Sequence, residues 1–180
     1  KAAIFEIWKT LIIAFVLVTL IIFLFLGNIK SVIVPAVALP VSLIGTFIGL
    51  YIFGLSINIF VLLSFILAIG IITDDAIIIT DSIAQKIEGG ETPLVASWLG
   101  AKSVTAPIIS TTLVLVASFA PLIFLSGISG TLFRETAIAL SFAIVVSSFV
   151  ALTLSPALAA NFLTKNMKKS KIALKFEKYY

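Results

Sequence analysis

Five long apolar segments restrict the folds that this chain can adopt. About 20 consecutive apolar residues in a helix span the hydrocarbon core of a bilayer. The predicted spans cover about residues 5–26, 32–53, 57–84, 104–125 and 136–163. They lack the alternation of apolar and polar residues that is typical of membrane barrels. We therefore predict an all-α integral membrane protein, built as a bundle of five transmembrane helices.

The composition indicates that lipid is the solvent for most of the chain. Hydrophobic residues make up 61% of the sequence and charged residues 11%, against about 45–50% and 25% in soluble domains. There is no Cys and no His, which excludes thiol catalysis, Ser–His pairs and the usual zinc sites. A phosphate-binding loop is also missing. We predict that the chain is not an enzyme and binds no metal, other cofactor or nucleic acid.

The distribution of Lys and Arg predicts the orientation of the bundle. Five spans place the chain ends on opposite sides of the membrane. One side holds Lys1, Lys9 and Arg134, and the other side holds the rest of the 12 basic residues. Because positive charge accumulates in cytoplasmic loops, the N-terminus is predicted to be periplasmic and the C-terminus cytoplasmic. The chain starts at Lys1 rather than Met, so we expect it to be a piece of a longer protein.

The end of the chain differs in character from the rest. Its lysines recur at helical spacing, with Ile172 and Phe176 on the adjacent face. Each Lys near an anionic leaflet contributes about 1 kcal/mol to membrane binding. We predict a five-helix membrane domain over residues 1–164 and a basic, amphipathic cytoplasmic helix over residues 165–180.

Two adjacent carboxylic acids, Asp74 and Asp75, lie slightly past the middle of the third span. A charged Asp at the centre of a membrane helix costs about 2.5–3.5 kcal/mol, and neighbouring carboxylates oppose each other's ionisation. No Lys or Arg lies in the first span from residue 11 onward or in any of the other four spans. We predict that at least one of the two acids is protonated at pH 7. Acids at this depth usually belong to an ion or proton pathway. The alternative is that the two aspartates only form hydrogen bonds to neighbouring helices.

Helical spacing puts the two aspartates on adjacent rows of the third span. The rows consist of small and polar residues: Ser64, Ala68, Asp75 and Ser82, and beside them Gly70, Asp74 and Asp81. Such a polar stripe belongs against other helices or a water-filled path. Asp81 lies about two turns nearer to the cytoplasm, where a carboxylate can reach the interface.

Other spans carry features that predict packing. Gly45 and Gly49 form a G-x-x-x-G step in the second span, which favours close helix contact. Residues 93–102 are expected to form a short amphipathic surface helix before the fourth span, with Thr92 as its N-cap. Within that span, Ser110, Thr111 and Thr112 are expected mostly to bond to their own backbone, with a polar path as the alternative.

The motif around the aspartates resembles a known family. Residues 70–75 have the form G-x-x-x-D-D, and residues 67–83, "LAIGIITDDAIIITDSI", resemble the fourth membrane helix of resistance–nodulation–division transporters. The resemblance is closest to the hydrophobe/amphiphile multidrug efflux branch, the acriflavine-type pumps. Residues 25–47, 53–58, 120–135 and 152–163 resemble that branch in the same order. Thr73 stands where that branch commonly has an aliphatic residue, and Asp81 where it commonly has Glu.

This resemblance implies helices two to six of a twelve-helix, trimeric pump of the bacterial inner membrane. In such pumps the residues matching Asp74 and Asp75 take up and release protons, which drives a periplasmic porter domain. Protons are then the coupling ion and no cofactor is needed. Gly70, Thr73 and Asp81 are auxiliary candidates.

The resemblance also implies partners. The C-terminal half of the transporter supplies the Lys and Arg counter-charges that this chain lacks. The lipid bilayer surrounds the bundle, and the full-length pump associates with a periplasmic adaptor and an outer-membrane channel.

Two further interpretations remain open at the level of sequence. The five-helix unit has the topology of the sterol-sensing domain of related eukaryotic proteins, which predicts a lipid-binding or regulatory module. An inactive truncated fragment is the other interpretation. If this chain binds lipid equally well when Asp74 and Asp75 are neutralised, the lipid-binding module is favoured.

Overall fold

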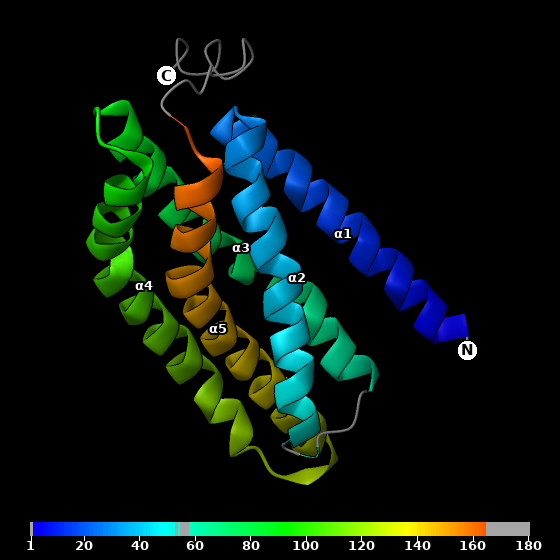
Figure 1. Cartoon of the computed structure of the whole chain (residues 1–180). Coiled ribbons are helices and arrows are strands. Elements are labelled where there is room, and N and C mark those ends of the chain that lie inside the picture. Colours follow the sequence, from blue (N-terminus) through cyan, green and yellow to red (C-terminus); the bar gives the residue numbers. More distant parts are fainter. Residues whose placement is uncertain (1, 53, 55–57, 165–180) are drawn as a thin grey trace, which may run out of the picture.

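The computed structural model describes residues 2–52, 54 and 58–164, and it folds into an all-helical bundle. The helices are α1 (Ala2–Leu26), α2 (Ile29–Ile52), α3 (Ile59–Glu88), α4 (Pro93–Ile123) and α5 (Gly127–Phe162). Successive helices run in opposite directions and are joined by short connections (Figure 1). The predicted all-α bundle is thereby confirmed. The cytoplasmic helix predicted over residues 165–180 lies outside the described residues.

The helices have the length and apolarity that a membrane requires. Four apolar segments are long enough to cross a bilayer: α2, α3, α4 and Gly130–Phe162 within α5. The first predicted span corresponds to α1, whose apolar stretch is Ile12–Leu24. Each predicted span therefore has a helical counterpart in the structure.

Helix α3 begins and ends at residues suited to those places. The side chain of Asn58 accepts a hydrogen bond from the Val61 N–H at 2.9 Å, which caps the start of the helix. The chain leaves the helix at Gly89 and turns at Gly90, where φ is +104° and glycine is favoured. The helix extends past the predicted limit at residue 84, because nothing before this glycine pair stops it.

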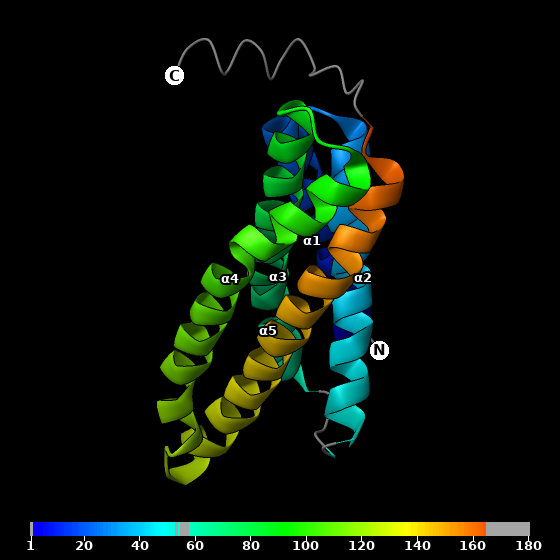
Figure 2. The same ribbon diagram turned by 60° about the vertical axis from the view of Figure 1, so that its left-hand side comes forward.

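Helix α4 corrects one prediction. Residues 93–102 do not form a separate surface helix but are the first turns of α4, which runs without interruption to Ile123. The predicted break between residues 102 and 104 contains no Gly or Pro that would end a helix, so the helical backbone continues through it. Thr92 and Pro93 precede and start α4 as expected, although the Thr92 side chain makes no capping hydrogen bond. Figure 2 shows that α4 changes direction along its length, and Pro107 lies within it.

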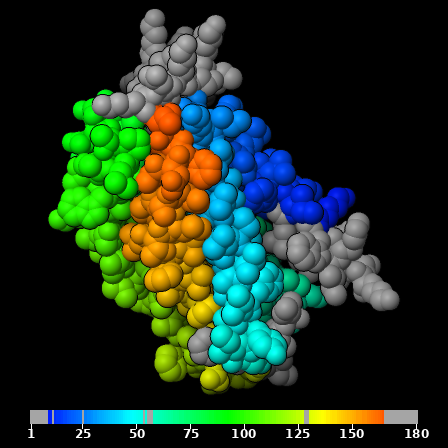
Figure 3. Space-filling model, in the orientation of Figure 1, coloured from blue at the N-terminus to red at the C-terminus, as the bar shows by residue number. Residues whose placement is uncertain are grey.

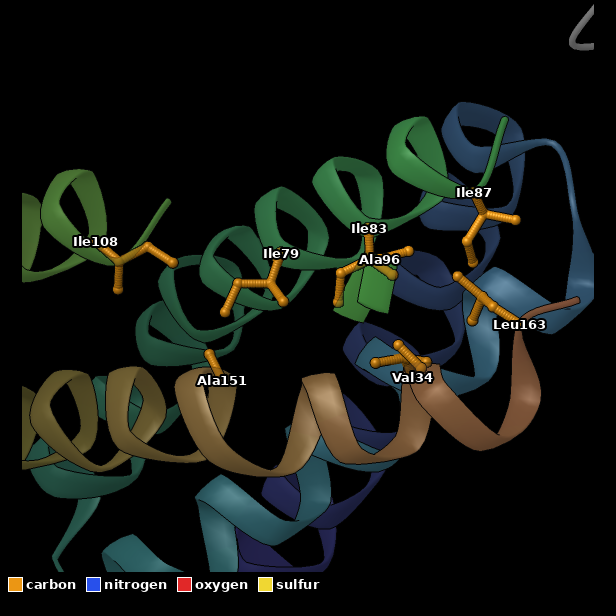
Figure 4. Close-up of a cluster of buried hydrophobic side chains, with 9 residues drawn as sticks. Val34, Ile79, Ile83, Ile87, Ala96, Ile108, Ala151 and Leu163 are labelled. Atoms are coloured by element: carbon orange, nitrogen blue, oxygen red, sulfur yellow. The ribbon is translucent and has the colours of Figure 1, made fainter. Parts of the chain in front are cut away.

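Buried side chains from several helices form the core. One cluster gathers at the end of the bundle where α3 and α5 finish, and its members turn toward one another (Figure 4). It contains Val34 of α2, Ile79, Ile83 and Ile87 of α3, Ala96 and Ile108 of α4, Ala151 and Ala159 of α5, and Leu163 directly after α5. A second cluster joins α2, α3 and α5 through Leu39, Ile69, Ile72 and Ile144. Helices α3 and α5 are therefore fixed against each other along much of their length.

The glycines of α2 lie at its contact with α5. A Cβ atom at position 49 would lie 1.8 Å from Cε1 of Phe142, and one at position 45 would lie 2.9 Å from Cγ1 of Val146. A larger residue at either position requires the Val146 or Phe142 side chain, or α5 itself, to shift. The predicted close packing at Gly45 and Gly49 is confirmed.

The outer surface is apolar. Along α1, the side chains of Ile12, Val16, Leu20 and Leu24 are exposed, and this helix slants across the edge of the bundle (Figure 1). On the face seen in Figure 3, α5 lies between α2 and α4 with no opening between their surfaces. An apolar exterior of this kind matches a lipid environment.

Candidate functional site

The two rows of α3 that carry the aspartates have different surroundings. Ser64, Ala68 and Asp75 are buried against neighbouring helices, and Asp75 is 9% exposed. Gly70, Asp74 and Asp81 are exposed along the adjacent row. The predicted polar stripe is thus divided: Asp75 is buried within the bundle, and Asp74 lies on the exposed row.

Asp75 is held from the opposite side by α5. The hydroxyl of Ser148 donates to Oδ2 of Asp75 at 2.8 Å, and Ser148 is 6% exposed. Ser147, the preceding residue, donates to the carbonyl oxygen of Ile72 at 3.2 Å. Two adjacent serines of α5 therefore bond to α3, one to the carboxylate and the other to the backbone. Neither serine was predicted as a site residue, because Ser in a membrane helix commonly bonds to its own backbone.

A second hydroxyl reaches the same place from α4. Oγ1 of Thr112 lies 2.5 Å from Oγ of Ser148 and 2.7 Å from the carbonyl oxygen of Ile108. The expectation of bonding within α4 is therefore correct for Thr112 but incomplete, because its hydroxyl also contacts α5. Side chains of α3, α4 and α5 meet around Asp75.

A cavity of about 430 Å³ lies beside the aspartate pair. It is lined by Ile71, Asp74, Asp75 and Ile78 of α3 and by Ser110, Thr111, Val114 and Leu115 of α4. Among the residues that the structure describes, its walls are apolar apart from the two carboxylic acids and two hydroxyls, and no Lys or Arg lines it. Thr111 bonds to backbone carbonyls of its own helix, as expected. The alternative of a polar path is compatible with the position of Ser110 and Thr111 on the wall.

The auxiliary candidates Gly70, Thr73 and Asp81 lie apart from the place where α3, α4 and α5 meet around Asp75. Thr73 is buried, and its hydroxyl donates to the carbonyl oxygen of Ile69 at 2.5 Å rather than to an aspartate. Asp81 accepts a hydrogen bond from Nε2 of Gln85 at 2.7 Å. Gly70 lies one turn from Asp74, and a Cβ atom there would meet nothing within 4 Å. Of the three, only Gly70 borders the open surface next to the pair.

Another polar contact joins α3 to α5 near the start of α3. Nδ2 of Asn58 donates to the carboxylate of Glu135, while its Oδ1 caps α3. Within the part of the chain that the structure describes, no three His, Cys, Asp or Glu side chains come together as a metal site requires.

Comparisons with known proteins agree with one another. The model of the AcrB/AcrD/AcrF family matches residues 1–180. The chain is 44% identical over 170 residues to the multidrug resistance protein MdtC of Pectobacterium atrosepticum, covering 94% of this chain and 17% of the relative. It is 46% identical over 156 residues to MdtC of Escherichia coli O139:H28, covering 87% of this chain and 15% of the relative.

An uncharacterized transporter of Haemophilus influenzae is 41% identical over 168 residues, covering 93% of this chain and 16% of that protein. The chain thus spans about a sixth of the length of the curated relatives it matches.

Proposed function

Since this chain belongs to the AcrB/AcrD/AcrF family of resistance–nodulation–division multidrug efflux transporters, we propose that it is the proton-binding part of the membrane domain of an efflux pump. It is a transmembrane portion of a multi-pass protein of the bacterial inner membrane. The proposed role is transport rather than catalysis, with protons as the coupling ion and no bound cofactor. Drugs or other amphiphiles are the proposed cargo of the full-length protein.

The observation that carries this proposal is the unequal setting of the aspartate pair. Both aspartates border the cavity, but Asp75 is buried and bonded to Ser148 of α5, whereas Asp74 is exposed. A carboxylate accepts hydrogen bonds only, and a protonated acid also donates. Uptake or release of a proton therefore changes which contacts stabilise the interface between α3 and α5.

The size of this effect is sufficient to move helices. Charging an Asp at the centre of a membrane helix costs about 2.5–3.5 kcal/mol. A difference of that size between two packings shifts their ratio about 100-fold. Proton binding on one side and release on the other can then cycle the bundle between two arrangements.

We further propose that the counter-charges come from the C-terminal half of the same transporter. Ionised acids within a membrane pair with a partner, and no basic residue of the described part of the chain lines the cavity. The open surface beside Gly70 and Asp74 leaves room for a long side chain from another helix. A trimeric full-length pump with a periplasmic adaptor and an outer-membrane channel completes the proposed assembly.

The proposed orientation is N-terminus periplasmic and C-terminus cytoplasmic. Nζ of Lys30 lies 3.3 Å from Oγ1 of Thr164, so the loop after α1 and the end of α5 share one side. That side also receives the end of α3, with Lys86, which fits the cytoplasmic excess of positive charge.

The proposal is tested by Asp74→Asn and Asp75→Asn in the full-length transporter that carries this segment. Efflux of a panel of amphiphilic dyes and antibiotics, and proton flux, are measured in vesicles with an imposed proton gradient. Both variants are expected to lose proton-driven efflux. Asp81→Asn is the matched control, because Asp81 bonds only to Gln85 on its own helix, and it is expected to retain most activity. Intact proton-driven efflux in Asp75→Asn would contradict the proposal.

The apolar walls of the cavity favour a second candidate function, a lipid-binding or regulatory module. Binding of a labelled lipid that is unchanged by both Asn substitutions would support that candidate and weigh against proton transport.

A further inference from the structure

Four oxygen atoms from three helices form a continuous row that ends in α4. Oδ2 of Asp75 lies 2.8 Å from Oγ of Ser148, which lies 2.5 Å from Oγ1 of Thr112. Oγ1 of Thr112 lies 2.7 Å from the carbonyl oxygen of Ile108. Ser148 also lies 3.1 Å from the carbonyl oxygen of Ile144, its own alternative acceptor.

Each hydroxyl in the row has one proton to donate, and this makes the row directional. An ionised Asp75 can only accept, so Ser148 donates to it and its lone pairs are left to accept from Thr112. When Oδ2 carries a proton, the acid donates to Ser148. The Ser148 proton then turns to Thr112 or to the Ile144 carbonyl, and the Thr112 proton turns to the Ile108 carbonyl. No proton moves along the row, because each hydroxyl rotates about its own C–O bond.

We propose that Thr112 is a positioning residue that transmits the proton occupancy of Asp75 to α4. This inference rests on the proposed function, in which Asp75 takes up and releases protons. With Asp75 ionised, Thr112 ties α4 to α5 through Ser148. With Asp75 protonated, the Thr112 hydroxyl donates to the Ile108 carbonyl within α4, and it can contact Ser148 only as an acceptor.

Helix α4 is able to respond to this change. Pro107 has no N–H and sits within the helix, which bends along its length (Figure 2). The Ile108 carbonyl next to it accepts from both Thr111, at 3.0 Å, and Thr112. Side-chain bonds of Ser and Thr to the carbonyl one turn back bend helices. Removing or restoring the Thr112 bond therefore acts on α4 next to its proline.

The displacement of α4 has a direct consequence for the aspartates. Ser110 and Thr111 of α4 form the wall of the cavity opposite Asp74. A change in the bend of α4 widens or narrows the cavity from which Asp74 and Asp75 are reached. Thr112 thereby links the protonation of Asp75 to access to the pair.

The test uses Thr112→Val and Thr112→Ser in the full-length transporter. The Val variant keeps the shape and removes the hydroxyl, and the Ser variant keeps the hydroxyl. Two quantities are measured: the infrared carbonyl band of protonated Asp75, assigned as the band lost in Asp75→Asn, and the maximal transport rate separately from KM. The matched control is Thr105→Val, which removes a hydroxyl of α4 that bonds to the Ala101 carbonyl at 2.8 Å.

Thr112→Val is expected to shift the Asp75 band and to lower the maximal transport rate about 2–10-fold with KM unchanged. Thr112→Ser should restore both, and Thr105→Val should change neither. The inference is overturned if Thr112→Val leaves the band and the rate unchanged, or if Thr112→Ser fails to restore them, while Asp75→Asn remains inactive. Proton-driven transport that persists in Asp75→Asn overturns the proposed function itself.

A second pair of variants covers the case in which Thr112→Val does not accumulate in the membrane. Thr112→Ala and Ser148→Ala each interrupt the row at a different atom. Both should shift the band in the same direction, and the absence of a shift in both would contradict the inference.

Discussion

Ser148 of α5 donates a hydrogen bond to Asp75 of α3 over 2.8 Å, and both side chains are buried. This contact lies in an interface that is mostly apolar, with the bond of Ser147 to the Ile72 carbonyl next to it. Asp75, the acid that we propose changes charge, therefore lies within the interface between α3 and α5.

Replacement of Ser148 by Ala is expected to impair transport. Hydrogen bonds to charged groups contribute about 1.5–3 kcal/mol, and the variant removes the donor that faces the ionised form of Asp75. We expect slower proton-driven efflux in vesicles. Ser147→Ala is the matched control, since Ser147 bonds to the backbone of Ile72 and not to the carboxylate. Equal effects of the two substitutions would show that the contact with Asp75 has no special role.

The aspartate pair should not be fully ionised in this chain alone. Neither acid has a Lys or Arg among the residues that line the shared cavity, and adjacent carboxylates oppose each other's charge. Infrared spectra of the chain in bilayers at pH 7 should contain the carbonyl band of a protonated carboxylic acid. The band should disappear in the Asp74→Asn, Asp75→Asn double variant. Two ionised carboxylates in the unmodified chain would contradict this prediction.

Gly49→Ala should destabilise the bundle, whereas Gly70→Ala should not. A Cβ at position 49 overlaps the ring of Phe142, and one at position 70 meets nothing within 4 Å. Overpacking costs about 1–3 kcal/mol, which a denaturation curve in detergent can resolve. Phe142→Leu in the Gly49→Ala background should recover part of the loss. If both glycine variants unfold at the same point as the unmodified chain, α2 does not pack on α5 in this way.

A large side chain at position 70 should affect transport rather than stability. Gly70→Leu fills the open surface beside Asp74, where we propose that a basic side chain of the C-terminal half enters. Efflux by the full-length transporter should fall strongly, while the denaturation curve of this chain stays the same. Ile78→Leu is the control. Ile78 is exposed one turn beyond Asp74, and this substitution exchanges one apolar side chain for another.

Asn58 has two roles that substitutions can separate. Asn58→Asp keeps an N-cap acceptor but places a carboxylate against Glu135, whereas Asn58→Ala loses both the cap and the contact. Loss of a cap costs about 1 kcal/mol. We expect Asn58→Ala to destabilise the chain by at least that amount, and Glu135→Gln to relieve the repulsion in Asn58→Asp. A failure of this rescue would show that the contact with Glu135 contributes little.

The sequence was sufficient to predict the helices and the position of the aspartates. Apolar runs specify spans because only a helix satisfies the backbone of a single segment in lipid. The two rows of α3 were also predictable from helical spacing. Their different surroundings were not, since spacing shows which residues share a row but not which row α5 covers.

The hydroxyls around Asp75 were missed for a related reason. Ser and Thr in membrane helices commonly bond to their own backbone, and Thr111 does so. Nothing in the sequence of the fourth or fifth span distinguishes Thr112 and Ser148 from such residues. Only the arrangement of three helices brings their oxygen atoms to Asp75. The continuity of α4 was missed because the polar and aromatic residues of its first turns resemble those of a surface helix.

The buried residues of α4 are Ala96, Ser97, Gly100 and Ile108, and none follows in the remaining turns. At Gly100, a Cβ would lie 2.9 Å from the backbone of Ile83, so this helix is clamped to α3 near its beginning. Beyond Ile108, Leu115, Val116 and Phe119 pack against the core only as partly buried side chains. Much of this half of α4 is therefore exposed to the surrounding lipid, so the thickness and stiffness of the bilayer should influence how fast the bend of α4 changes.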